Sequence, residues 1–172
     1  MSASPPAWRA LPVEAAYFRQ VMGRYPTGVT ILTTVRDGEP VAMTANSIMS
    51  VSVEPLLMLA CVELASRFHD AVLASGVWGV SVLSADAQPV AAWLATRGRP
   101  GQGMLDGVPH QVGALTGVAL LDDAVSALEC RTVAVYPGGD HSIIVAEVVA
   151  LYLSRNDEPA LLYHRGRYGV AP

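Results

Sequence analysis

TANSIMSVS, residues 44–52, lies between two apolar runs that are typical of β-strands, 28–34 and 56–62. Its side chains are small, or they carry hydroxyl and amide groups that donate and accept hydrogen bonds without charge. Such a surface lets a flat ligand approach the backbone closely and pair along an edge that alternates donors and acceptors. The alternative is an edge strand whose polar side chains simply meet water. The segment alone leaves both interpretations open.

The composition indicates a single folded domain with a sizeable core. The chain has 172 residues, of which 52% are hydrophobic and 15% are charged, so it is too apolar to be disordered. This apolar content exceeds what one small domain usually hides, and we therefore expect an oligomer with a buried interface. The net charge of −4, without a basic run, argues against a nucleic-acid partner.

Several residue types are absent or isolated. All eleven residues in the Lys+Arg count are arginines, which excludes a Schiff-base lysine and a P-loop lysine. Cys61 and Cys130 each lie in an apolar run, so we expect two buried thiols and no disulfide. Residues 1–6 lack the pattern of a signal peptide, and the apolar run 56–62 is too short to cross a bilayer. We therefore expect a cytoplasmic protein with no membrane partner.

Hydrophobic periodicity predicts a mainly β fold with a few short helices. Residues 1–12 are rich in proline and alanine and predict a flexible N-terminal arm, which leaves residues 13–172 as the single domain. Helices are expected at 13–24, 66–75 and 85–96, and strands at 28–35, 41–43, 56–62, 77–83, 128–136, 142–153, 161–163 and 168–170. This pattern, without an internal repeat or a G-x-G-x-x-G motif, indicates a small antiparallel barrel and disfavours a doubly wound fold.

The strands at 128–136 and 142–153 flank the turn sequence PGGD and should form a long hairpin. The hairpin brings Arg131 within about one register step of Glu147, so the two side chains pair if they share a face. Residues 97–117 are glycine-rich and irregular, and a loop of this length in a compact domain is usually functional or mobile.

The sequence gives little support for a metal site or for a hydrolase site. The four histidines, His69, His110, His141 and His164, show none of the usual metal-ligand spacings, so we expect no metal site. No G-x-S-x-G elbow is present for a serine hydrolase.

Two segments could bind an anion. Ser66 opens a predicted helix with Arg67 beside it, and the free N–H groups there can hold a phosphate; an ordinary helix cap explains the same residues. The run YHRGRY, residues 163–168, combines aromatic faces with charged donors that suit a flat anionic dinucleotide. Its alternative is a solvated basic chain end.

Considered together, short blocks from about Phe18 to Tyr168 resemble the flavin reductase family of the FMN-binding split-barrel fold. The blocks are FRQVMG (18–23), PTGVT (26–30), MTANS (43–47), SVSVEP (50–55), SG (75–76), LECR (128–131), GDH (139–141) and LY (162–163). Each block is short, but their order and spacing are specific. The resemblance implies a mainly β split barrel, flavin reductase-like, that forms a homodimer.

The resemblance also implies an activity. Such enzymes use NADH or NADPH to reduce FAD or FMN by direct hydride transfer from nicotinamide C4 to flavin N5, so the protein mainly aligns two rings. Many of them supply reduced flavin to a separate monooxygenase. Two other functions stay open: a flavin-binding store or sensor without reductase activity, and an oxidase of the pyridoxamine-phosphate type, which needs a more basic phosphate pocket.

The resemblance implies the site residues as well. Those at the isoalloxazine edge are Thr44, Ala45, Asn46 and Ser47, and those at the ribityl chain and phosphate are Ser50, Val51 and Ser52. The phosphate end takes Cys61, Val62, Ser66, Arg67 and Phe68. The nicotinamide side takes His141, which positions the ring, with Tyr163, Arg165 and Tyr168, and Thr27 completes the cofactor-binding set. The chain departs from the family pattern at Phe68, at Ser81 and at GRPGQG, residues 98–103.

Overall fold

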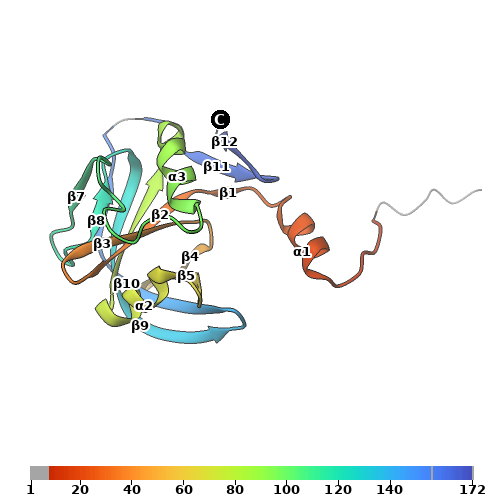
Figure 1. Cartoon of the computed structure of the whole chain (residues 1–172), viewed down its shortest axis with the longest axis horizontal. Helices are drawn as coiled ribbons and strands as arrows, with labels where there is room; N and C mark the ends of the chain where they lie inside the picture. Colours follow the sequence, from red (N-terminus) through yellow and green to blue (C-terminus); the bar gives the residue numbers. More distant parts are fainter. Residues whose placement is uncertain (1–7, 156, 172) are drawn as a thin grey trace, which may run out of the picture.

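A computed structural model describes residues 8–155 and 157–171 and shows one large curled sheet (Figure 1). Its strand order is β3-β2-β6-β9-β10-β5-β4, and all neighbouring strands are antiparallel. The strands are β2 Thr30–Arg36, β3 Glu39–Ala45, β4 Ile48–Val53, β5 Leu56–Glu63, β6 Val77–Leu83, β9 Ala124–Gly138 and β10 His141–Leu153. The predicted mainly β fold is thus confirmed.

The sheet curls because a two-residue link joins its opposite edges. β3 and β4 are the edge strands, and only Asn46 and Ser47 lie between them. Laid flat, seven strands would hold these edges about 29 Å apart, whereas such a link spans at most about 11 Å. We call this link, Asn46 and Ser47, the seam. Ser47 binds it to β5: the carbonyl of Ser47 accepts from the N–H of Cys61 (2.9 Å), and the hydroxyl of Ser47 donates to the carbonyl of Cys61 (2.8 Å). The segment 44–52 therefore contains both the seam and an edge strand.

Two smaller sheets flank the barrel. One has the order β1-β11-β12, from β1 Thr27–Gly28, β11 Leu161–His164 and β12 Arg167–Val170. It places Tyr163 opposite both Thr27 and Tyr168, so the aromatic C-terminal run lies beside the start of the barrel (Figure 1). The other sheet pairs β7 His110–Val112 with β8 Ala119–Leu121, two strands that lie in or next to the expected irregular loop.

The helices are α1 Ala15–Met22, α2 Arg67–Ser75 and α3 Gln88–Ala95, with a 3₁₀ turn at Ala85–Ala87. Ser66 caps α2 by accepting from the N–H of His69 (3.2 Å), and Gly76 ends it at a φ of 68° that favours glycine. α2 contacts β2 and β3, and α3 packs mainly on β3. α1 differs, because none of its side chains is buried and it lies apart from the barrel (Figure 1). Its predicted apolar face is therefore not covered within one chain.

Strand alternation determines which side chains form the core. On β5, Met58, Ala60 and Val62 are buried, while Leu57, Leu59, Cys61 and Glu63 face the other side and stay half-buried. The expectation that this strand is apolar and buried on both faces is therefore corrected to one face. Both cysteines are free; Cys130 is fully buried, whereas Cys61 is not.

The long hairpin forms as predicted, and Arg131 lies directly opposite Glu147. The two side chains do not pair, because a guanidinium nitrogen of Arg131 donates to the carbonyl of Leu115 (2.8 Å). Within residues 8–155 and 157–171, no helix has the length and hydropathy needed to cross a membrane.

Candidate functional site

A groove of about 750 Å³ lies between α1 and the wall of the barrel. Its barrel side combines seam residues with side chains of β4 and β5, including Asn46, Ser47, Ile48, Met49, Leu59 and Cys61. Its other side comes from α1 and the following turn, including Phe18, Arg19, Met22 and Tyr25. Apolar walls with a few fixed polar groups are typical of a small-molecule site.

The polar groups on the barrel side of the groove are neutral and held in place. The amide nitrogen of Asn46 donates to the hydroxyl of Thr27 (3.1 Å), which leaves the amide oxygen as an acceptor. The hydroxyl of Thr30 donates to the carbonyl of Ala45 (2.7 Å). Ser47 is hydrogen-bonded to the backbone of Cys61 through both its hydroxyl and its carbonyl. The seam therefore offers hydrogen-bonding atoms in a fixed arrangement, as a flat heteroaromatic ligand requires.

A smaller cavity of about 130 Å³ adjoins the groove and shares Asn46 and Tyr163 with it. The rings of Tyr163 and Tyr168 meet edge to face, with centroids 5.4 Å apart. Burial, and then the neighbouring Tyr163, raise the pKa of Tyr168, so its hydroxyl stays protonated at neutral pH. Thr44 also lines this cavity, although its hydroxyl donates to the carbonyl of Ala91 in α3 (2.7 Å).

The structure brings a large part of the predicted site together at the seam. These residues line one or both cavities: Thr27, Thr44, Ala45, Asn46, Ser47, Cys61, Tyr163 and Tyr168. The β3–β4 link, the alternation of β5 and the pairing of β1 with β11 place them there. Sequence reasoning missed the groove contacts of Leu59 and Met49; the first follows from the period of two that puts Leu59 on the same face as Cys61.

Other predicted residues lie elsewhere. Ser50, Val51 and Ser52 lie farther along the edge strand β4, outside the groove lining. The structure places Val62 and Phe68 in the core, 0% and 2% exposed, instead of in the groove. For Val62 the reason is strand alternation, and for Phe68 it is the inward face of α2.

Ser66 and Arg67, predicted to bind a phosphate together, use their side chains for separate contacts. Ser66 uses its hydroxyl as a helix cap, which is the structural alternative given above. The guanidinium of Arg67 donates to the carbonyl of Arg99 in the glycine-rich loop. Arg165 lies in the β11–β12 turn at a φ of 51°, and its N–H donates to the carbonyl of Gly23 (2.8 Å). None of the three lines the groove.

His141 pairs with the neighbouring residue of its turn, Asp140. Its Nδ1 donates to a carboxylate oxygen of Asp140 (2.7 Å), and this bond lowers the pKa of Asp140. Because Ile143 lies opposite Cys61 and His141 lies opposite Glu63, His141 and Cys61 occupy the same face of the sheet. His141 is therefore outside the groove lining but only about 7 Å farther along its face.

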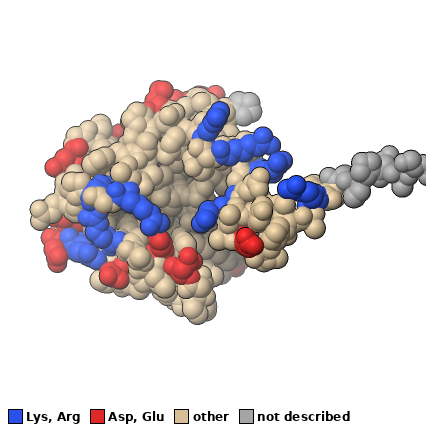
Figure 2. Space-filling model, turned by 45° about the vertical axis from the view of Figure 1, so that its right-hand side comes forward, with Lys and Arg blue, Asp and Glu red and all other residues tan. Residues whose placement is uncertain are grey.

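Charge is distributed unevenly over the surface. Figure 2 shows arginine side chains gathered in two groups on one face, with acidic side chains beside the left-hand group. Within the part of the chain that the structure describes, no group of three or more His, Cys, Asp or Glu side chains is placed to hold a metal ion.

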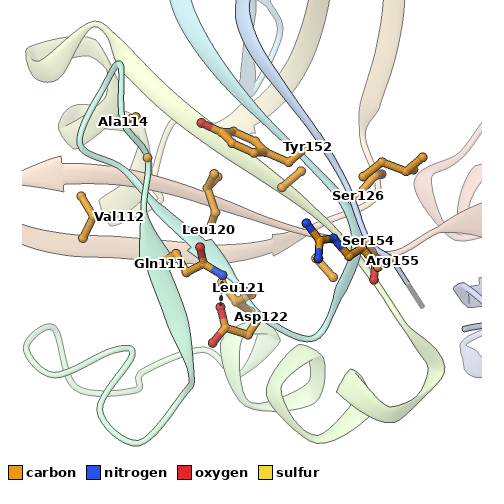
Figure 3. Close-up of a pocket in the computed structure, with 14 residues that line it drawn as sticks. Gln111, Val112, Ala114, Leu120, Leu121, Asp122, Ser126, Tyr152, Ser154 and Arg155 are labelled. Atoms are coloured by element: carbon orange, nitrogen blue, oxygen red, sulfur yellow. Dashed lines mark hydrogen bonds between the residues drawn. The ribbon is translucent and has the colours of Figure 1, made fainter. Parts of the chain in front are cut away.

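A second cavity, of about 610 Å³, shares no lining residue with the groove (Figure 3). It lies between the β7–β8 pair and the ends of β9 and β10, and the Gln111 amide donates to Asp122 (3.2 Å) across its wall. Beside it, Tyr152 donates to the carboxylate of Glu129 (2.6 Å). This cavity has a different chemical character from the groove, because its lining includes charged residues of both signs, Asp122 and Arg155.

Glu129 is fully buried and was not predicted as a special residue. Its second oxygen accepts from the N–H groups of Leu115 and Thr116 and from the Thr116 hydroxyl (3.0, 2.7 and 2.6 Å). Burial alone would raise the pKa of Glu129, but these donors outweigh it and the pKa is lowered. The carboxylate therefore stays charged and fixes the β7–β8 turn. The available signal was the single acidic residue of β9.

Residues 22–172 match the family model described as the flavin reductase like domain. The chain belongs to the flavin reductase family. It is 40% identical over 147 residues to an NADH-dependent FAD reductase of Streptomyces globisporus (85% of this chain, 80% of the relative). It is 33% identical over 161 residues to the reductase subunit HsaB of a flavin-dependent monooxygenase of Rhodococcus jostii (93% and 80%).

The solved structure of BorF, the flavin reductase component of a bacterial two-component tryptophan halogenase, superposes with a TM-score of 0.87. The two sequences are 39% identical, and the alignment covers 92% of this chain and 99% of BorF. Structural neighbours of this kind confirm the split-barrel fold of this flavin reductase.

Replacing Asn46 with leucine should weaken flavin binding, because the amide oxygen at the seam is lost and ligand heteroatoms lose a partner. We expect a loss of roughly 1–3 kcal/mol, which is about 5- to 150-fold in Kd, measured by quenching of flavin fluorescence. Gln111→Leu, the same type of change in the second cavity, is the matched control. Equal affinities of wild type and Asn46→Leu would contradict the assignment.

Proposed function

We propose that this flavin reductase oxidises NADH, reduces FAD or FMN, and supplies the reduced flavin to a separate monooxygenase. The observation that carries the proposal is the 750 Å³ groove, whose barrel side carries the neutral seam residues of a flavin reductase fold. Relatives named as an NADH-dependent FAD reductase and as a monooxygenase reductase subunit support the substrates and the two-component arrangement.

The groove residues fit a flavin. With a flavin bound, the amide of Asn46 and the backbone of Ser47 would meet the polar edge of its ring, and Ile48, Met49 and Leu59 would offer apolar contact to its faces. When both cofactors are bound, the nicotinamide supplies a hydride and the flavin accepts it. Among the described residues, the groove lining contains no carboxylate and no histidine. This suits a reaction in which the protein aligns two rings and keeps water out, with no proton transfer by a side chain.

We also propose that the protein works in the cytoplasm. NADH is an intracellular reductant, and the two cysteines are free thiols, as expected in a reducing compartment. Fractionation of cells that recovered the protein outside the cytoplasm would contradict this location.

The activity can be tested by following NADH oxidation at catalytic protein concentration, with and without added FAD or FMN. We expect many turnovers per chain that depend on free flavin. Flavin binding without NADH oxidation would contradict the proposal and would identify a flavin store or sensor.

We propose that His141 positions the nicotinamide against the flavin. It lies on the groove face of the sheet, beyond Cys61, at the mouth of the long hairpin. Its bond to Asp140 orients the ring, and the other ring nitrogen can reach a carboxamide.

His141→Ala should raise the Michaelis constant for NADH or slow hydride transfer, while flavin affinity stays nearly unchanged. Stopped-flow reduction of bound flavin, together with a flavin titration, separates the two effects. His110→Ala removes an exposed histidine next to the second cavity and is the control. Reduction as fast as wild type at every NADH concentration would show that His141 is only structural.

We further propose a homodimer. Phe18 and Val21 on α1 are 66% and 53% exposed, and Met49 and Val53 on β4 are 62% and 82% exposed. An isolated eight-residue helix is marginal in water, so α1 needs a partner surface. α1 and β4 both border the groove, and a second copy that covers them would bury the apolar excess seen in the composition.

Sedimentation at micromolar concentration should give twice the chain mass of 18.1 kDa. Val21→Asp should shift the species toward the monomer, because it places a charge in the proposed interface. Leu115→Asp, at an exposed loop site, should not. A wild-type protein that is fully active as a monomer would overturn this proposal.

A further inference from the structure

The mouth of the long hairpin, where His141 lies, is held only weakly by its own turn. His141 is the first residue of β10, and its partners Gly138 on β9 and Glu63 on β5 are the last residues of their strands. The turn continues through Gly139, whose φ is 75°, so its backbone is conformationally permissive. The Asp140 side chain that binds His141 is 90% exposed, and exposed pairs contribute little to stability. The position of His141 therefore depends on contacts outside the turn.

One such contact is buried and comes from α2. Ser142 follows His141 and lies opposite Val62, so its side chain points to the core face of the sheet. The hydroxyl of Ser142 lies 2.9 Å from Nε2 of His69 on α2. Ser142 is 7% exposed and His69 is 9% exposed. Losing one partner of a buried hydrogen bond is costly, because the other partner is left unsatisfied. This contact therefore links the start of β10 firmly to α2.

The ring of His69 is oriented from its other side. Its Nδ1 lies 3.3 Å from a carboxylate oxygen of Asp70. Because an ionised carboxylate only accepts hydrogen bonds, Nδ1 carries the proton of the neutral ring, and Nε2 is left to accept from Ser142. The backbone N–H of His69 is fixed as well, since it donates to the hydroxyl of Ser66 (3.2 Å) at the helix cap. His69 thus presents one acceptor in a fixed direction.

Ser142, His69 and Asp70 have the residue types of a hydrolytic triad, but their arrangement does not support hydrolysis. The Ser142 hydroxyl is buried and lines neither the groove nor the second cavity, so it offers no nucleophile to a bound substrate. The Asp70 side chain is 80% exposed, whereas the acid of a hydrolytic triad is buried. The three side chains therefore hold the hairpin and do not attack a substrate.

The contact determines where His141 points. Consecutive residues of a strand face opposite sides, so a Ser142 fixed on the core face sets the direction of His141 on the groove face. β5 adds a backbone contact, because the N–H of Leu64 donates to the carbonyl of Asp140 (3.0 Å). A displacement of about 1 Å in a group that aligns reactants can cost about 100-fold in rate. The hold on the hairpin mouth is therefore relevant to the alignment of a nicotinamide.

We propose that His69 is a positioning residue for hydride transfer. By accepting from Ser142, it fixes the start of β10 and, through the backbone, the side chain of His141. In this assignment neither His69 nor Ser142 touches a cofactor. The inference rests on the proposed function in that His141 acts on the nicotinamide.

A double-mutant cycle tests whether His69 acts through His141. Stopped-flow reduction of bound flavin by NADH is measured in wild type, His69→Phe, His141→Ala and the double variant. His69→Phe keeps an aromatic ring but cannot accept from Ser142, so it should raise KM for NADH or slow reduction by up to about 100-fold, with flavin Kd nearly unchanged. In the His141→Ala background, the same change should add less than about twofold. Equal effects in both backgrounds would overturn the proposal.

Three further variants separate positioning from a general loss of stability. Ser142→Ala removes the donor and should reproduce the selective loss. His69→Gln keeps a side-chain acceptor for Ser142 and should recover most of the reduction rate. Thr33→Val removes a buried hydroxyl that donates to the carbonyl of Ala119 (2.6 Å) between β2 and β8, so it should lower the melting temperature without changing KM for NADH. Melting of each variant verifies that it folds. Reduction slowed as much in Thr33→Val as in His69→Phe would contradict the positioning role.

Amide hydrogen exchange provides a readout that does not depend on flavin reduction. Peptides that cover residues 138–143 should exchange about tenfold faster in His69→Phe and Ser142→Ala, the factor that corresponds to losing one buried hydrogen bond. Peptides that cover the seam should not change. Faster exchange at the hairpin mouth in a protein that oxidises no NADH would sink the proposed function and keep the link between α2 and β10. Unchanged reduction kinetics in both variants, with or without faster exchange, would overturn the positioning role.

Discussion

The connection between β3 and β4 constrains the whole molecule. Two residues, Asn46 and Ser47, must bridge opposite edges of a seven-stranded sheet, so the sheet has to close into a barrel. The same two residues lie outside the regular ladder, and the amide oxygen of Asn46 becomes available as an acceptor at the surface of the seam. Closure of the barrel thus depends on one short segment, and the hydrogen bonds between Ser47 and Cys61 hold that segment in place.

The chemistry of this flavin reductase is consistent with a groove that carries little charge. Hydride transfer between two bound rings needs alignment and dryness more than an acid or a base. Apart from Arg19, the charged groups of the described chain lie outside the groove lining. Glu129 is surrounded by four donors of the protein and fixes a turn. The arginines around loop 98–103 donate instead to backbone carbonyls.

The apolar residues in excess of the core lie in particular parts of the structure. The barrel interior takes the alternate residues of the strands, but α1 and the edge strand β4 keep large apolar side chains exposed. Both surfaces border the groove. A second copy that covers them would remove the exposed edge that β4 otherwise presents to other strands.

The amino-acid sequence by itself determined the local features of this protein. The long hairpin, the cap at Ser66, the glycine stop at Gly76 and the neutral polar character of residues 44–52 follow from near neighbours in the chain. The tertiary structure alone decided which side chains meet. Cys61 faces the groove while Val62 faces the core. Which of two alternate residues faces the core depends on the register of the strand and on barrel closure, and both are set by partner strands far away in sequence. Thr27 likewise meets Tyr163 only through a pairing across most of the chain, and no local pattern carries that information.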